Sequence, residues 1–154
     1  RKDDENNLIL MKTQYSAVSG RPDENGNFDY SKNAQAMAFE GPIPEGDYSI
    51  NPQEIQKFDE LNFFNKIIST LGIGGKFKGG KIAWGEERVW ITPSSVQVEN
   101  PNVENTFINR SNFSIHGGSI PGSAGCIDLH KNATAFFNKL SKSNYSIIKL
   151  RVKY

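Results

Sequence analysis

Short alternations of apolar and polar residues recur along the chain and predict a mainly β protein. The clearest lies near the end, where Ile148, Leu150 and Val152 alternate with basic residues, which is typical of a strand with one buried face. Similar patterns bounded by turn residues predict further strands within 8–15, 41–50, 81–98 and 113–115. Because Pro42 and Pro44 cannot donate ladder hydrogen bonds, we expect 41–50 to be a connector or an edge strand.

Two segments show the spacing of an amphipathic helix. Between residues 52 and 71, apolar side chains recur every three or four positions, with Pro52 in the first turn and Gly72 after the last. Residues 132–140 repeat the pattern, which predicts a second helix packed on a sheet. The glycine-rich segment 72–80 lacks the Gly-Lys-Ser/Thr ending of a phosphate-binding loop, so we interpret it as a connector.

The composition indicates one folded domain with little overall charge. The chain has 154 residues, of which 36% are hydrophobic and ten are Phe, enough for a core without disulfides or a metal. Its 18 Lys and Arg against 17 Asp and Glu give a net charge of +1, which disfavours nucleic acid as a partner. No apolar run reaches the roughly 20 residues of a membrane-spanning helix. We therefore expect a monomer without a membrane span, in which a polar arm, 1–7, precedes a single domain, 8–154.

A cysteine and a histidine in a glycine-rich segment point to a thiol enzyme. Cys126 is the only cysteine, and His116, one of two histidines, precedes it with several glycines and a proline between them. These residues allow the chain to turn back, so that the two side chains can meet. A cysteine attacks as a thiolate, and an imidazole can take its proton. The backbone N–H groups of Gly125 and Cys126 are placed to hold the oxyanion that forms at the attacked carbonyl.

A catalytic histidine also needs a partner that orients its second nitrogen. For His116 the candidates are the carbonyl of Gly117, the side chain of Ser119 and that of Asp128, and the sequence does not choose among them. We favour a different role for Asp128, as the cap of the helix predicted at 132–140.

Two other interpretations of the cysteine remain open from spacing alone. Free cysteine is among the most buried residue types, so Cys126 also fits a structural position in a core. A zinc site would combine His116, Cys126, Asp128 and His130, but their spacing matches no common ligand pattern. We therefore predict neither a metal nor another cofactor. His130 is the weaker candidate for a base, because it stands only a few residues from the cysteine, and we expect it on the solvent side.

A substrate site needs further groups around the pair. Arg110 is a candidate for a bidentate contact with a substrate carboxylate, although a surface or strand-pairing position explains it equally well. Trp84 and Trp90 fit a core, with the lining of a substrate groove as the alternative. Three further candidate substrate contacts lie near the pair in sequence: Gly118, Ser119 and Asp128.

Residues 115–127 contain Ile-His-Gly and Ser-Ala-Gly-Cys-Ile, and they resemble the active-site signature of L,D-transpeptidases of the YkuD type. The segment departs from that signature in three ways. The spacing from histidine to cysteine is shorter, Ala124 stands where a second histidine falls, and Asp128 replaces the arginine two positions after the cysteine.

With these departures the chain is more similar to a relative of that family, the Tlde1-like group of type VI secretion effectors. Three other segments resemble this group in consistent order: 15–20, Gly-Pro-Ile-Pro-Glu-Gly-Asp-Tyr at 41–48, and Arg-Ser-Asn-Phe-Ser-Ile-His-Gly at 110–117. The resemblance covers most of the chain, with a helical insertion near 52–80.

The resemblance implies a mainly β, L,D-transpeptidase-like catalytic domain that acts on peptidoglycan stem peptides. It puts the nucleophile on Cys126 and the base on His116, with Gly117, Ser123 and Gly125 shaping the site. The implied reaction is acyl transfer from a tetrapeptide stem through a cysteine thioester. Hydrolysis, exchange of a D-amino acid and cross-linking all remain open as outcomes.

The resemblance also implies a place of action and partners. It suggests an antibacterial effector that a bacterium secretes and that acts in the periplasm of a target or producing cell. Its partners would then be the stem peptides, the secretion apparatus and a cognate immunity protein. The alternative function is a non-catalytic module that binds cell-wall peptide or a partner protein on the same fold.

Overall fold

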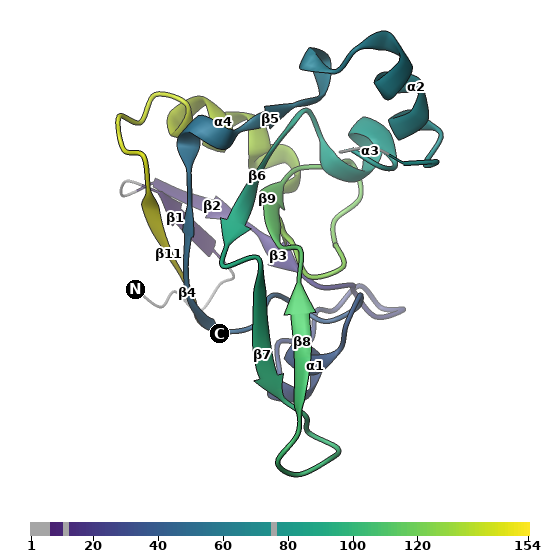
Figure 1. The fold of residues 1–154 in the computed structure, drawn as a ribbon, viewed down its shortest axis with the longest axis vertical. Coiled ribbons are helices and arrows are strands. Elements are labelled where there is room, and N and C mark those ends of the chain that lie inside the picture. Colours follow the sequence, from purple (N-terminus) through teal and green to yellow (C-terminus); the bar gives the residue numbers. More distant parts are fainter. Residues whose placement is uncertain (1–6, 11–12, 75–76) are drawn as a thin grey trace.

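The computed structural model describes residues 7–10, 13–74 and 77–154, and it is mainly β, which confirms the predicted class (Figure 1). Residues 1–6 of the polar arm lie outside the described residues, and the division into an arm and one domain stays a prediction. The strands are β1 (Asn7–Leu10), β2 (Thr13–Ser16), β3 (Val18–Ser19), β4 (Gly46–Ile50), β5 (Gln56–Lys57), β6 (Glu87–Thr92), β7 (Ser95–Glu99), β8 (Phe107–Ser111), β9 (Ser114–His116), β10 (Ile127–Asp128) and β11 (Ile148–Val152). The helices are α1 (Lys32–Ala36), α2 (Phe63–Thr70), α3 (Gly80–Trp84) and α4 (Ala133–Leu140), with short 3-10 turns η1 (Pro52–Glu54), η2 (Phe58–Glu60) and η3 (His130–Asn132).

One seven-stranded sheet organises the described part of the chain. Its strands are hydrogen-bonded in the order β11-β4-β6-β9-β10-β3, and β5 pairs with β6 beside this path. All neighbours are antiparallel except β9 and β10, which run parallel. The pairs β1–β2 and β7–β8 form separate two-stranded sheets, and Figure 1 shows the β7–β8 hairpin extending away from the main sheet.

The core lies between one face of this sheet and α4. Val89 and Ile91 of β6 and Ile115 of β9 are buried in it, at alternate positions of their strands. The buried residues of α4 in the same core are Phe136, Phe137 and Leu140. The helix predicted at 132–140 and its burial are therefore confirmed.

Two predicted strands differ from the structure in their pairing. The segment 8–15 is not one strand, because its described residues belong to β1 and β2, which pair as an antiparallel hairpin. The strand in 41–50 is β4, which lies inside the sheet between β11 and β6, so the edge position is wrong. Pro42 and Pro44 come before β4 begins at Gly46, and the strand therefore loses no ladder hydrogen bond to them.

The single helix predicted over 52–71 is also wrong. The segment contains η1, β5 and η2 before α2 begins, where the side chain of Asn62 accepts a backbone hydrogen bond at 2.8 Å. Gln56 pairs with Arg88 of β6, so sheet hydrogen bonds override the helical spacing in the first half. Much of the apolar stripe of α2 faces solvent, with Phe64 at 69% exposure.

Residues 80–84, where the alternation predicts a strand, form the short helix α3. It follows Gly79 and ends at Gly85, and both have a positive φ, which glycine adopts without strain. Strands β6 and β7 follow as predicted, on either side of Pro93. In Figure 1, α2 and α3 lie at the end of the sheet where β6 begins and β9 stops, which is where the candidate site forms.

Candidate active site

Three neighbouring strands bring the candidate residues to one face of the sheet. His116 of β9 pairs with Arg88 of β6 on one side and with Asp128 of β10 on the other. Cys126 directly precedes β10, two residues before Asp128, and Ser114 lies two residues before His116. Because side chains two apart in a strand share a face, all five point away from the core that holds Ile115. The thiol and the imidazole therefore lie next to each other.

The thiol of Cys126 has polar neighbours. Ser114 Oγ donates a hydrogen bond to Sγ at 3.3 Å, and Sγ donates toward the carbonyl oxygen of Asn112 at 3.7 Å. Cys126 is the free cysteine of the chain, and only 5% of its surface is exposed. A purely structural cysteine packs as a small hydrophobe, so these hydrogen bonds favour a chemical role.

The imidazole of His116 is fixed in one tautomer. Its Nδ1 lies 2.5 Å from the carbonyl oxygen of Gly117, which can only accept, so Nδ1 carries the proton and Nε2 the lone pair. The ring is 2% exposed, and Nε2 has no hydrogen-bond partner among the described residues. Of the three orienting groups that the sequence leaves open, the structure shows the Gly117 carbonyl, which accepts the hydrogen bond from His116 Nδ1–H. The ring of Trp84 covers the imidazole at 4.8 Å between centroids.

The two groups shift each other's pKa toward a charged pair. Burial is the largest influence on both, and it disfavours the charged forms. The interaction with the partner group outweighs it, so the pKa of His116 is raised and that of Cys126 is lowered. In this geometry the thiol donates toward Asn112 rather than Nε2, and transfer of its proton to Nε2 would give thiolate and imidazolium.

The loop after His116 is clamped between two helices. Gly117 N–H donates to the Trp84 carbonyl at 3.2 Å, and Ser119 N–H donates to a carbonyl of α3 at 2.9 Å. A Cβ atom on Gly117 would lie 2.5 Å from the Cβ of Ala133, so only glycine fits where α4 passes. Glycine is thus required at position 117 to place the carbonyl that orients the imidazole.

His130 braces the same loop, which corrects the expectation that it points to solvent. It is half-buried, and its Nδ1 lies 2.9 Å from the carbonyl oxygen of Gly118. Because the carbonyl accepts, Nδ1 of His130 is the donor. The two histidines of the chain therefore hold two consecutive carbonyls, those of Gly117 and Gly118.

Asp128 ties loops together instead of capping α4, so the predicted cap is wrong. Its Oδ2 accepts from Gly122 N–H at 3.0 Å, and its Oδ1 accepts from His130 N–H at 2.8 Å. The N-cap residue of α4 is Asn132, and its side chain accepts no hydrogen bond from the first turn of the helix. The Asp128 carboxylate is 1% exposed, and its charge contributes to the raised pKa of His116.

Ser123 and Gly125 shape the backbone in front of the nucleophile. Ser123 Oγ donates to the Cys126 carbonyl at 2.7 Å, and its N–H donates to the Gly20 carbonyl at 2.9 Å. Gly125 has a φ of 109°, which a residue with a Cβ rarely adopts, and this sets the direction of the Cys126 N–H. The oxyanion role of the Gly125 and Cys126 N–H groups stays a prediction.

Arg110 lies against Gly125, and its guanidinium bonds to backbone carbonyls. Its guanidinium donates to the carbonyl of Gln35 and to that of Gly41, the latter at 3.0 Å, and the residue is 2% exposed. This arrangement holds β8 to the segment before β4. It does not favour the predicted contact with a substrate carboxylate.

Arg88, which no sequence pattern singles out, is the cross-strand partner of His116. Its guanidinium carbon lies 4.6 Å from the ring centre of Trp84, 4.2 Å from that of Trp90 and 5.3 Å from that of Phe77. We call these three rings the Arg88 cage. Burial lowers the pKa of Arg88 to about 10, and the negative charge of Cys126 opposes this shift. The two tryptophans thus surround a cation instead of filling the core predicted for them.

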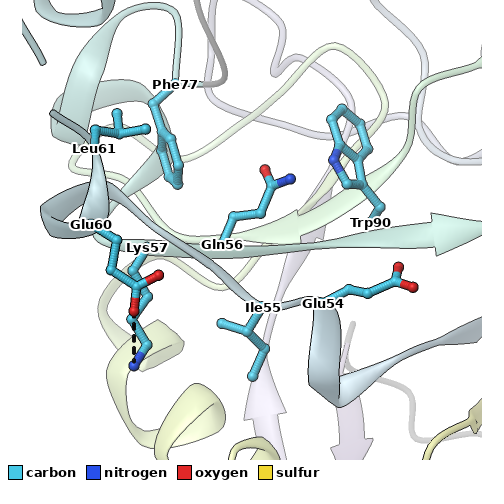
Figure 2. Close-up of a pocket in the computed structure, with 8 residues that line it drawn as sticks. All are labelled: Glu54, Ile55, Gln56, Lys57, Glu60, Leu61, Phe77 and Trp90. Atoms are coloured by element: carbon cyan, nitrogen blue, oxygen red, sulfur yellow. Dashed lines mark ion pairs between the residues drawn. The ribbon is translucent and has the colours of Figure 1, made fainter. Parts of the chain in front are cut away.

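A pocket of about 520 Å³ opens beside the Arg88 cage. Phe77 and Trp90 form part of its wall, and Figure 2 shows the amide of Gln56 between these two rings. The same amide accepts a hydrogen bond from Arg88 Nε at 3.2 Å. Cys126 is not among the residues that line this pocket. Its remaining lining residues, drawn in Figure 2, are Glu54, Ile55, Lys57, Glu60 and Leu61.

Within the described residues, no group of three or more His, Cys, Asp or Glu side chains is arranged to hold a metal ion. The groups of the zinc alternative bond elsewhere: Asp128 to backbone N–H groups and His130 to the Gly118 carbonyl. Among the helices of the described chain, none is both long and apolar enough to cross a bilayer.

Comparison with known proteins places the chain in a family. A family model described as the Tlde1 domain matches residues 14–150, which include every site residue named above. The chain belongs to the Tlde1 domain family. This is a family of type VI secretion effectors, and the membership confirms the resemblance to the Tlde1-like group.

The other comparisons add little. No curated protein matches the chain. Among solved structures, it is similar to Bd1075 of Bdellovibrio bacteriovorus, with 16% identity and a TM-score of 0.42 over 88% of this chain. The match covers only 37% of that protein, and the likeness is too weak to bear on fold or function.

Proposed function

We propose that this Tlde1 domain is a cysteine enzyme that acts on tetrapeptide stems of peptidoglycan, as an L,D-carboxypeptidase or as an L,D-transpeptidase that exchanges D-amino acids. The observation that carries the proposal is the pair of Cys126 and His116. A buried thiol lies beside an Nε2 atom whose lone pair has no partner among the described residues, while Nδ1 is locked by Gly117. This is the arrangement of a nucleophile with its general base.

The reaction would proceed in two steps. The Cys126 thiol passes its proton to Nε2 of His116, and the thiolate attacks the carbonyl carbon of the L-to-D peptide bond. The tetrahedral oxyanion collapses, the C–N bond breaks, and Nε2 returns the proton to the leaving nitrogen of D-alanine. The acyl group stays on Sγ as a thioester. Water or the amine of a D-amino acid then loses a proton to Nε2 and attacks the thioester, which restores the thiol.

Incubation of the full chain with purified muropeptides, followed by mass analysis, tests this proposal. We expect tetrapeptide stems to lose D-alanine, or to exchange it when another D-amino acid is supplied. Cys126→Ala should abolish the reaction, and His116→Ala should slow it by about 10²- to 10⁴-fold, the usual contribution of a general base. Tyr145→Ala, at a side chain that is 67% exposed, is a control that should leave the rate unchanged. Unchanged muropeptides together with measurable binding would instead support a non-catalytic binding module.

Family membership supports an effector role for this activity. We propose that a type VI apparatus delivers the protein, that it acts in the periplasm, and that a cognate immunity protein blocks the site. Expression with a periplasmic export signal should then inhibit bacterial growth, whereas expression in the cytoplasm should not. The Cys126→Ala variant serves as the control in both compartments. Equal growth of wild type and variant in the periplasm would contradict the role.

A further inference from the structure

Arg88 is a buried cation without a carboxylate partner. It is 4% exposed, and among the described residues no Asp or Glu lies within ion-pair distance of it. Its hydrogen bond to Gln56 uses Nε, so the described residues supply no hydrogen-bond partner for the two terminal nitrogens. Charges that proteins bury are normally paired, because the desolvation of an unpaired ion is costly. The described chain provides no carboxylate for this cation, and its terminal nitrogens remain available to the carboxylate of a ligand.

The Arg88 cage holds the guanidinium in place for such an anion. Rings at 4.2 to 5.3 Å from its central carbon attract the cation through their faces. These faces cannot accept the in-plane hydrogen bonds of the terminal nitrogens, which suit the planar fork of a carboxylate. The cage thus orients the cation and leaves its two terminal nitrogens free to bind a carboxylate.

The position of Arg88 selects which carboxylate it meets. Arg88 pairs with His116 across the sheet, and it is close enough to Cys126 for the thiolate charge to act on it. One peptide residue spans at most about 3.6 Å, so an anion held by Arg88 belongs to the residue beside the attacked carbonyl. In a stem that loses its last residue, that anion is the C-terminal carboxylate.

We propose that Arg88 binds the C-terminal carboxylate of the substrate peptide and so restricts cleavage to the last peptide bond. The inference rests on the proposed function, and it names the group that recognises the leaving D-amino acid. The same contact would receive an incoming D-amino acid during exchange, because its carboxylate occupies the equivalent place. The competing role for Arg88 is to stabilise the Cys126 thiolate alone.

Two synthetic tetrapeptide stems separate these roles, one with a free C-terminal carboxylate and one with a C-terminal carboxamide. In wild type we expect kcat/KM for the acid to exceed that for the amide by about 10- to 150-fold, the range of a hydrogen bond to a charged group. Arg88→Met should lower kcat/KM for the acid peptide to the value for the amide peptide, and it should leave kcat/KM for the amide peptide nearly unchanged. Arg88→Lys should restore part of the preference, since it returns the charge without the fork. Arg151→Met, at an exposed arginine paired with Asp47, is the matched control.

Binding to the inactive Cys126→Ala chain tests the inference independently of turnover. Calorimetry should show tighter binding of the acid than of the amide, and Cys126→Ala with Arg88→Met should lose the difference. If this preference is present but wild type cleaves neither peptide, the inference stands and the proposed chemistry fails. Equal binding of both peptides overturns the inference, whether or not they are cleaved. A uniform loss of activity in Arg88→Met, with a shifted pH profile of thiol alkylation, would assign Arg88 to the thiolate and also overturn it.

Discussion

Ser114 Oγ donates a hydrogen bond to Cys126 Sγ at 3.3 Å, from a residue with no exposed surface. The bond is one of the influences that lower the pKa of Cys126, because it favours the thiolate. A serine two residues before His116 on the same strand face is thus part of the nucleophile's environment.

Replacement of Ser114 by Ala should therefore weaken the nucleophile. We expect the pKa of Cys126 to rise and kcat/KM near neutral pH to fall by about tenfold, as one hydrogen bond to a charged group is lost. The pH dependence of iodoacetamide alkylation of Cys126 measures the first effect directly. Ser95→Ala, at an exposed serine of β7, is the control. A Ser114→Ala profile that superimposes on wild type would show that the hydrogen bond does not act on the thiol.

The opposite shifts at Cys126 and His116 predict a bell-shaped pH dependence of kcat/KM. The pKa of Cys126 is lowered and that of His116 is raised, and both shifts favour the pair of thiolate and imidazolium. Activity is lost as pH falls through the Cys126 pKa, because the thiolate is protonated. It is lost again as pH rises through the His116 pKa, because the leaving amine then receives no proton.

The acid limb of the kcat/KM profile should lie at a pH below the ordinary pKa of a cysteine thiol. His116→Ala should move the alkylation profile of Cys126 to higher pH, since it removes the largest influence that favours the thiolate. If Cys126 is alkylated with the ordinary pKa of a thiol, and His116→Ala does not change that pKa, the two groups do not form a pair.

Gly117→Ala should abolish activity with a smaller effect on folding. The new Cβ would lie 2.5 Å from the Cβ of Ala133 and would push the loop that orients His116 away from α4. The additional change Ala133→Gly removes that contact and should restore part of kcat. Gly74→Ala, whose Cβ meets only the flexible end of Ile68 at 3.8 Å, is the matched control. Full activity of Gly117→Ala would contradict the tight fit at this loop.

The two helices with apolar stripes should differ sharply in their contribution to stability. Phe137 of α4 is fully buried, so Phe137→Ala should lower the free energy of unfolding by about 3–5 kcal/mol. Phe63 of α2 is 80% exposed, and Phe63→Ala should change the free energy of unfolding by less than about 0.5 kcal/mol. Urea denaturation measures both. Similar losses for the two variants would mean that α2 packs against the core.

Local patterns in the sequence predict the parts of the fold that depend on local or repetitive signals. Helix α4 and strand β11 follow from hydrophobic spacing because each buries one regular face. The prediction of one helix over 52–71 fails because the helical spacing competes with pairing to β6, a contact between residues distant in sequence. The same limit applies to β4, whose interior position depends on pairing with β6 and β11, both distant in sequence.

The residues of the candidate site also fall into those that the sequence reveals and those that it does not. Cys126, His116 and the glycines between them stand out because their chemistry and spacing are visible in one short segment. Ser114 could have been found from its spacing to His116. Arg88 could not, because its relation to His116 exists only through the register of β6 against β9. The role of Asp128 is not visible in the sequence, because its partners are the N–H groups of Gly122 and His130, which no local pattern predicts.

The central claim is that Cys126 carries the stem peptide as a thioester, and intact-mass spectrometry of the full chain tests it most directly. The protein is mixed with a tetrapeptide stem and quenched in acid, which preserves thioesters. We predict a mass increase equal to that of the stem minus D-alanine, located on Cys126 by peptide mapping and absent from Cys126→Ala. Release of D-alanine without this adduct, or an equal adduct on the Cys126→Ala variant, would contradict the account.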